Sequence, residues 1–103
     1  MNQKDINLAN RLKLSAQRAL LGAITPNIRT IFVELVDDDI QIYFYYDGIV
    51  QEDDEENASI VSSEIIADFD DEFDINLVIK QVDYPMNIIQ SSGMCIYYRK
   101  EVQ

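Results

Sequence analysis

Residues 29–46 read RTIFVELVDDDIQIYFYY, and this stretch determines the fold that we predict for the chain. Apolar side chains alternate with others along 29–36 and again along 40–46. β-Branched and aromatic residues that repeat at every second position are typical of strands. Three aspartates at 37–39 separate the two runs, and aspartate favours tight turns because it tolerates the left-handed conformation and bonds to its own backbone. The stretch therefore predicts a β-hairpin.

An amphipathic helix is predicted before the hairpin, from about Lys4 to Leu21. Its apolar residues recur at three- and four-residue steps and form one stripe, and Gly22 follows where a left-handed residue ends many helices. The stripe consists of Ile6, Ala9, Leu12, Ala16, Ala19 and Leu20. The remaining surface carries four of the eight basic residues, which we interpret as a solvated face that also balances acidic charge elsewhere: Lys4, Arg11, Lys13 and Arg18.

A second helix and two more strands are predicted after the hairpin. The helix runs from about Ala58 to Phe69 and buries Val61, Ile65 and Phe69, while residues 51–56 form a polar, acidic connection before it. Residues 75–82 and 94–100 alternate as strands do. The predicted order of elements is therefore α-β-β-α-β-β.

This order predicts an α+β fold in a single domain that spans residues 1–103. Short connections favour antiparallel pairing, and both helices then cover one face of the sheet. We expect a two-layer sandwich of a four-stranded antiparallel sheet and two helices on one face. The second face of the sheet is then open, and we expect Tyr43, Tyr45 and Tyr97 to stand on it.

Acidic residues are concentrated in the middle of the chain. No basic residue lies between Arg29 and Lys80, although sixteen of the nineteen acidic residues lie there, and the net charge is −11. A protein this acidic is repelled by nucleic acids and by anionic membrane surfaces, so we expect neither as a partner. The charge favours a cationic protein partner. The alternative interpretation is a solvated surface that aids solubility.

The composition excludes several kinds of catalytic site. The chain has no histidine, and its single cysteine, Cys95, lies in the apolar run MCIYY, where we expect it to be buried. Ser-His-Asp and Cys-His catalysis and His or Cys zinc sites are therefore excluded. Carboxylates at 68–74 are the best metal candidate, but they lack the central glycine and terminal glutamate of an EF-hand loop. We expect no enzymatic activity and no cofactor.

Several short phrases resemble small immunity-type proteins that are encoded beside bacterial polymorphic toxins, including those of contact-dependent growth inhibition. These phrases are RLKLSAQRALLGAITPNIR (11–29), YYDG (45–48), EDDEE (52–56), EIIADF (64–69) and YYRKE (97–101). The resemblance covers most of the chain and concerns overall arrangement, with no catalytic signature. It implies a non-enzymatic protein that binds a cognate toxin domain in the cytoplasm of the producing cell and blocks it. Many such toxins are nucleases, which are basic because they hold nucleic acid.

The predicted partner-binding surface combines carboxylates around the second helix with tyrosines of the hairpin, because charge steers association and tyrosines anchor interfaces. It consists of Glu52, Asp53, Asp54, Glu55, Glu56, Asp70, Asp71 and Glu72, with Tyr43, Tyr45 and Tyr46 as anchors. Three alternatives stay open: a nucleic-acid mimic or regulatory module that binds another cationic protein, a divalent-metal-binding domain, and a structural subunit whose open sheet face pairs with a second copy. We expect a monomer or weak homodimer. A cytoplasmic location is expected from the single cysteine and from an N-terminal stretch without the apolar core of a signal peptide.

Overall fold

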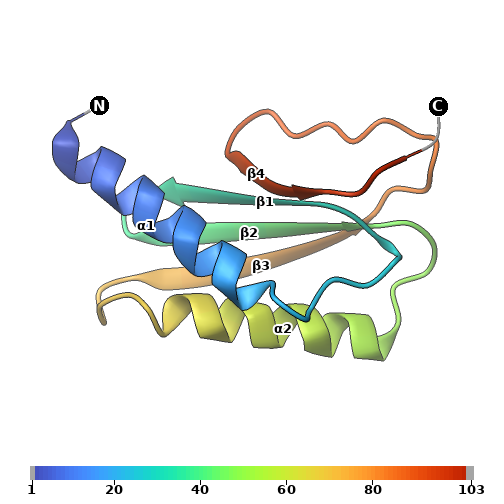
Figure 1. The fold of residues 1–103 in the computed structure, drawn as a ribbon, viewed down its shortest axis with the longest axis horizontal. Helices are drawn as coiled ribbons and strands as arrows, with labels where there is room; N and C mark the ends of the chain where they lie inside the picture. The colour runs from blue at the N-terminus through green and yellow to red at the C-terminus, as the bar shows by residue number, and fades with distance from the viewer. Residues whose placement is uncertain (1, 102–103) are drawn as a thin grey trace.

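The computed structural model describes residues 2–101 and contains a four-stranded sheet with both helices on one face (Figure 1). Residues 1, 102 and 103, which belong to the predicted domain, lie outside the described range. The strands lie in the order β3-β2-β1-β4. Within residues 2–101, neither helix combines the length and the apolar character needed to cross a membrane. The elements are α1 (Gln3–Ala19), β1 (Ile28–Val36), β2 (Asp39–Tyr46), α2 (Glu52–Ile66), β3 (Asp74–Gln81) and β4 (Met94–Tyr98).

The predicted hairpin is present as β1 and β2. The two strands pair antiparallel from Val36 opposite Asp39 to Ile28 opposite Tyr46, and Asp37 turns the chain with a φ of 55°. The alternating apolar residues also lie on one face of the pair, as predicted, and this face is buried against the helices. That face carries Ile31, Val33, Ile40, Ile42, Phe44 and Tyr46, all of which are buried.

The prediction of a purely antiparallel sheet is wrong, because β3 pairs parallel to β2. The register runs from Asp39 opposite Asp74 to Tyr46 opposite Gln81. The physical reason is the crossover between these strands. The 15 residues of α2 span roughly 22 Å, about as far as the eight residues of β2 extend, so the helix returns the chain to the end at which β2 began. A parallel pair needs such a crossover, and α2 supplies it.

Helix α2 begins at Glu52 and ends at Ile66, whereas the sequence predicted about 58–69. The acidic residues that we assigned to a connection form the first turn of the helix. The backbone N–H of Gln51 donates to Asp54 Oδ2 at 2.9 Å, which fixes the helix start. Carboxylates also favour this end of a helix because they oppose the positive end of its dipole. The predicted apolar residues Val61, Ile65 and Phe69 are buried, although Phe69 follows the end of the helix.

Helix α1 matches its predicted range closely and begins at a cap. Asn2 Oδ1 accepts the backbone N–H of Asp5 at 2.9 Å. Leu12 and Ala16, in the predicted stripe, are buried, but Ile6 is 39% exposed because the first turns of α1 extend beyond the strands at the left of Figure 1. The helix packs against β1, β4 and α2, while α2 packs against β3.

The last strand pairs with β1 antiparallel, and its register shifts near its centre. Tyr97 lies opposite Ile31, and Cys95 lies opposite Phe32. This irregularity breaks the simple alternation of β4. Tyr97, expected on the open face, is half-buried against the core, and Cys95, expected to be buried, is exposed. Both expectations were wrong because a bulge changes which side chains share a face.

Candidate partner-binding surface

The first turn and a half of α2 present four exposed carboxylates to solvent. These residues make none of the ion pairs found within residues 2–101. Because they project from a capped helix, their positions are fixed by the fold and do not depend on a loop conformation. We refer to them as the α2 acidic turn, which consists of Glu52, Asp53, Glu55 and Glu56.

Asp54 belongs to the same predicted cluster but has a structural role. It is half-buried, and its Oδ1 accepts a hydrogen bond from Asn27 Nδ2 at 3.1 Å while its Oδ2 accepts the N–H of Gln51. The carboxylate thereby joins the start of α2 to the turn that precedes β1. Because both of its carboxylate oxygens accept hydrogen bonds within the protein, Asp54 is less available to a partner than its exposed neighbours.

The other predicted carboxylates, Asp70, Asp71 and Glu72, are exposed in the connection between α2 and β3. The parallel pairing brings the β1–β2 turn beside them, since the N–H of Asp74 donates to the carbonyl oxygen of Asp38 at 3.0 Å. Local sequence patterns do not join these segments, because they predict no parallel pair. The resulting group, which we call the acidic end, consists of Asp37, Asp38, Asp39, Asp70, Asp71, Glu72 and Asp74, all exposed.

The α2 acidic turn and the acidic end lie at opposite ends of α2 (Figure 1). The length of α2 separates them by roughly 22 Å, more than twice the screening length of about 8 Å at physiological ionic strength. At this ionic strength they act as two separate patches of negative charge on the same flank of the molecule. A partner that contacts both must extend along α2.

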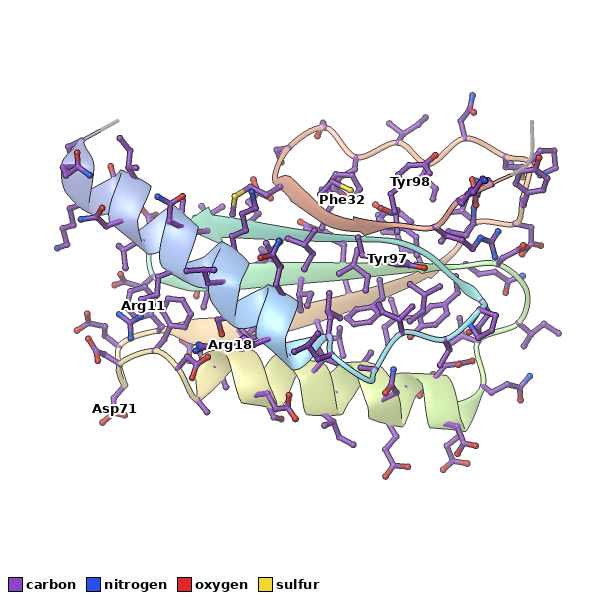
Figure 2. The ribbon with its side chains drawn as sticks, viewed as in Figure 1. Arg11, Arg18, Phe32, Asp71, Tyr97 and Tyr98 are labelled. Carbon is purple, nitrogen blue, oxygen red and sulfur yellow. The ribbon has the colours of Figure 1, made fainter. Side chains whose placement is uncertain are left out.

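Residues of α1 neutralise one carboxylate near the acidic end, that of Asp68. Arg18 Nη2 lies 3.0 Å from Asp68 Oδ2, and Ser15 Oγ donates to the same oxygen at 2.6 Å. The hydrogen bond from Ser15, followed by the charges of Arg18 and Arg11, lowers the pKa of Asp68. Arg11 also donates to the Asp68 carbonyl oxygen and lies 4.8 Å above the ring of Phe69. Figure 2 shows both arginines directed toward this segment, whereas Asp71 points away from the molecule. This contact confirms the expectation that part of the basic face of α1 balances acidic charge.

Two of the three predicted tyrosine anchors are buried. Tyr46 lies in the core between sheet and helices, where its ring stacks on Phe44 at a centroid distance of 6.1 Å. Burial, with a smaller contribution from the charge of Asp54, raises the pKa of Tyr46 to about 12. Tyr45 faces the opposite side of the sheet and donates to Gln90 Oε1 at 2.5 Å. In this structure neither ring is accessible to a partner, whereas Tyr43 is half-exposed and its role stays a prediction.

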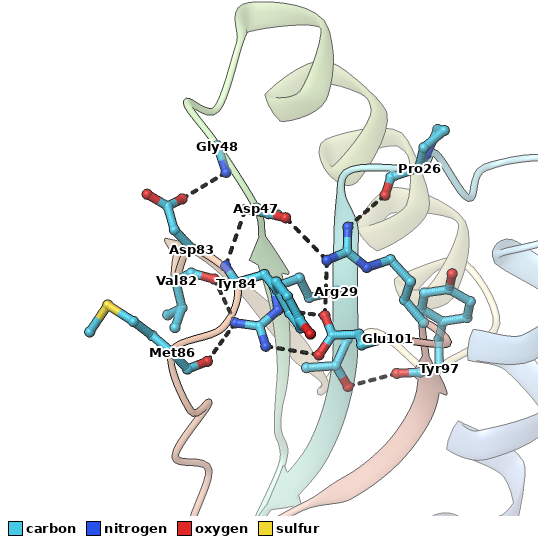
Figure 3. A network of polar contacts seen from close by, with 12 residues as sticks. Pro26, Arg29, Asp47, Gly48, Val82, Asp83, Tyr84, Met86, Tyr97 and Glu101 are labelled. Atoms are coloured by element: carbon cyan, nitrogen blue, oxygen red, sulfur yellow. Dashed lines mark hydrogen bonds and ion pairs between the residues drawn. The ribbon is translucent and has the colours of Figure 1, made fainter. Parts of the chain in front are cut away.

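Tyr45 is buried because the segment 82–93 covers part of the sheet face that we expected to be open. Arg29 holds this segment: its side chain is 4% exposed, and Nη1 donates to the carbonyl oxygens of Val82 and Met86 at 2.7 and 2.8 Å. Nε and Nη2 donate to the carboxylate of Glu101 (Figure 3). Pattern reasoning missed this network because no local periodicity connects residues 29, 82 and 101.

The same face carries exposed aromatic side chains around a small pocket. The pocket has a volume of about 260 Å³ and is lined in part by Arg29, Phe32, Tyr84 and Tyr98. Tyr98 is 63% exposed. Arg29 uses its N–H groups within the protein, so this pocket offers no free guanidinium to an anion. The pocket is a second surface suited to contact, opposite the helices.

The thiol of Cys95 is exposed and contacts neutral polar groups. The one thiol, Cys95 Sγ, contacts Thr30 Oγ1 at 3.5 Å and the carbonyl oxygen of Tyr97 at 3.4 Å, and neither group is a base that activates a nucleophile. Across the part of the chain that the structure describes, no three His, Cys, Asp or Glu side chains are placed to share a metal ion. Exposed carboxylates on a rigid helix are the dominant chemical feature.

The chain matches the model of a known protein family. The family model described as MafI2 immunity protein matches residues 9–101, a span that contains most of α1 and every later element. No curated protein matches the chain.

Proposed function

The chain belongs to the MafI2 immunity protein family, and from this we propose that it binds and blocks a cognate toxin domain that is a basic nuclease. The proposed setting is the cytoplasm of the producing bacterium, where an unblocked nuclease would meet the cell's own nucleic acid. The protein acts by occupying the toxin and catalyses no reaction. The family match supports the immunity role, and the charge of the protein supports the basic target.

The proposal of a basic target rests on the excess of carboxylates without a basic partner along the α2 side of the molecule. Of the arginines, Arg18, Arg29 and Arg99 are engaged in internal ion pairs with Asp68, Glu101 and Asp47. The α2 acidic turn and the acidic end therefore keep their charge. Opposite net charges on two proteins raise their association rate by one to three orders of magnitude at low salt. Rapid capture suits an inhibitor that must act before its target does.

A nuclease target accounts for the form of this surface. A nuclease holds phosphates with lysine and arginine side chains, and counterion release supplies much of its affinity for nucleic acid. The exposed carboxylates of the α2 acidic turn offer the same side chains an alternative partner at fixed spacing along a helix. The protein then competes with nucleic acid for one cationic surface. This reasoning assigns the main contact to Glu52, Asp53, Glu55 and Glu56.

The composition supports the absence of catalysis. The chain contains no histidine, and the thiol of Cys95 lies beside a hydroxyl and a carbonyl group. Blocking by occupancy requires only affinity and reach. We also propose that the protein works as a monomer or weak homodimer, which its mass in solution tests by light scattering.

Inhibition in vitro tests the proposed function. The toxin domain encoded beside the protein is purified and assayed on RNA and on DNA with increasing amounts of the protein. We expect co-purification at low salt and complete loss of nuclease activity near one equivalent. A toxin domain whose activity is unchanged by a tenfold excess of folded protein would contradict the proposal. If the protein binds and blocks a toxin domain that cleaves neither RNA nor DNA, the immunity role stands and the nuclease assignment is wrong.

A further inference from the structure

A groove of about 540 Å³ opens between the N-terminal half of α1, the end of β1 and the start of β4. Its lining includes three apolar side chains, Leu8, Leu35 and Met94, and three acidic residues, Asp5, Glu34 and Asp37. No basic residue lines it. The volume lies within the range of about 300–1,000 Å³ that is typical of ligand sites in proteins, so it has room for a long side chain and its neighbours.

The groove arises because β4 is shorter than β1. The pairing of the two strands ends with Met94 opposite Val33, whereas β1 continues to Val36. Gly93 explains the early end: its φ is 97°, and a Cβ atom there would lie 2.9 Å from the carbonyl oxygen of Val33. The chain therefore approaches β1 closely at Gly93 and turns away. Within the described residues, the last part of β1 has a strand partner only on its β2 side.

The lining defines the chemistry of an occupant. Lysine and arginine have an aliphatic stem that packs on apolar surface and a charged head that seeks carboxylates. An anionic group is repelled by Asp5 and Asp37. A purely apolar group would bury the same carboxylates without a partner, which is unfavourable. The groove therefore complements a long basic side chain better than either.

We propose that this groove receives a lysine or arginine side chain of the cognate toxin domain. The aliphatic stem lies on Leu8, Leu35 and Met94, and the charged head lies near the carboxylates of Asp5 and Asp37. The inference rests on the proposed function and names the place where the protein would hold the toxin domain. Asp37 belongs both to the groove and to the acidic end, so the surface that attracts a basic protein leads directly to the place that holds one of its side chains.

The groove and the exposed charges around it should affect different rate constants of binding. Peripheral charges act mainly on the association rate, whereas groups that are desolvated in the complex act mainly on the dissociation rate. The test variant is Asp5→Asn/Asp37→Asn, since asparagine also tolerates the positive φ of residue 37. The matched control is Glu64→Gln/Asp71→Asn, which removes the same charge from exposed positions in α2 and in the connection that follows it. A third variant, Ala9→Trp, fills the groove from α1 without changing the charge.

Surface plasmon resonance with the immobilised toxin domain measures both rates for each folded variant. We expect the groove variant and Ala9→Trp to dissociate about tenfold faster than the wild type, as the loss of a charged hydrogen bond implies. The control pair should slow association and leave dissociation within about twofold. If both groove variants dissociate no faster than the control, the groove is not the anchor. If the wild type binds and the groove variants dissociate at its rate, this inference alone is overturned. If the wild type does not bind the toxin domain, the proposed function is overturned as well.

Discussion

The guanidinium of Arg29, in β1, donates two hydrogen bonds to the carboxylate of Glu101, which lies 72 residues later in the chain. Nε lies 2.7 Å from Oε2, and Nη2 lies 2.9 Å from Oε1. Both side chains are at most 5% exposed. Arg99 Nη2 adds a contact of 2.9 Å to the same carboxylate and one of 3.1 Å to Asp47. This pair fastens the C-terminal segment and the segment 82–93 to the sheet.

Removal of the Glu101 charge should destabilise the protein strongly. Glu101→Gln leaves the cation of Arg29 buried beside a neutral amide, and the loss of one partner of a buried pair costs about 3–5 kcal/mol. We expect the free energy of unfolding in urea to fall by about 3 kcal/mol. Lys100→Gln, at the exposed neighbour, should change it by less than about 0.5 kcal/mol. Equal effects of the two substitutions would show that the pair contributes little.

The same carboxylate should make the protein sensitive to acid. The hydrogen bond from Arg29, with that from Arg99, outweighs burial and lowers the pKa of Glu101 from 4.5 to about 2. A lowered folded-state pKa contributes stability that is complete above the unfolded pKa of 4.5 and is lost as the pH falls toward 2. The unfolding free energy of the wild type should therefore decline between about pH 5 and pH 2. It should decline less steeply in Glu101→Gln, and parallel pH profiles for the two proteins would contradict this assignment.

Tyr46 should ionise only at strongly alkaline pH in the native protein. Its pKa is raised to about 12 because its ring is buried. A raised folded-state pKa contributes stability that is complete below the ordinary value of 10 and is lost as the pH rises toward 12. Stability should fall over this range in the wild type and less in Tyr46→Phe. Absorbance at 295 nm follows the titration, and a difference between wild type and Tyr46→Phe that titrates near pH 10 would contradict the burial.

Substitution of Gly93 should cost more than the same substitution of Gly22. Both residues have a positive φ, 97° and 79°, at which alanine is strained by about 1–2 kcal/mol. A Cβ atom at Gly22 meets nothing within 4 Å, whereas one at Gly93 lies 2.9 Å from backbone oxygen of Val33. We expect Gly93→Ala to lose at least about 1 kcal/mol more than Gly22→Ala in thermal or urea unfolding. Similar losses would mean that the strand approach at Gly93 is not tight.

The hairpin, both helices and the number of strands were predictable from sequence because each follows a local pattern. The alternation of 29–46 fixed which side chains face the helices, and the apolar stripe of α1 located its buried face at Leu12 and Ala16. The immunity family was identified from short phrases, and the family match confirms it. These features depend on neighbours in the chain.

Features that depend on long-range geometry were missed. The parallel pairing of β2 with β3 follows from the length of α2, whose predicted start lay six residues too late. The burial of Tyr45 depends on a distant segment that Arg29 holds in place, and the exposure of Cys95 follows from a bulge in β4. The acidic end joins Asp38 to Asp74 only through the parallel pair. Apart from the start of α2, each of these errors concerned contacts between residues far apart in sequence.

The association rate with the toxin domain, measured by stopped flow as a function of salt, tests the central claim most directly. The variant Glu52→Gln/Asp53→Asn/Glu55→Gln/Glu56→Gln removes the α2 acidic turn and keeps Asp54, which fixes the helix start. Between about 50 and 500 mM salt we expect the wild-type rate to fall at least about tenfold, because screening weakens the attraction of opposite charges. The variant should associate more slowly at low salt, depend less on salt, and approach the wild-type rate at high salt. Identical rates and identical salt dependence for both proteins would contradict the claim that this charge directs the protein to its partner.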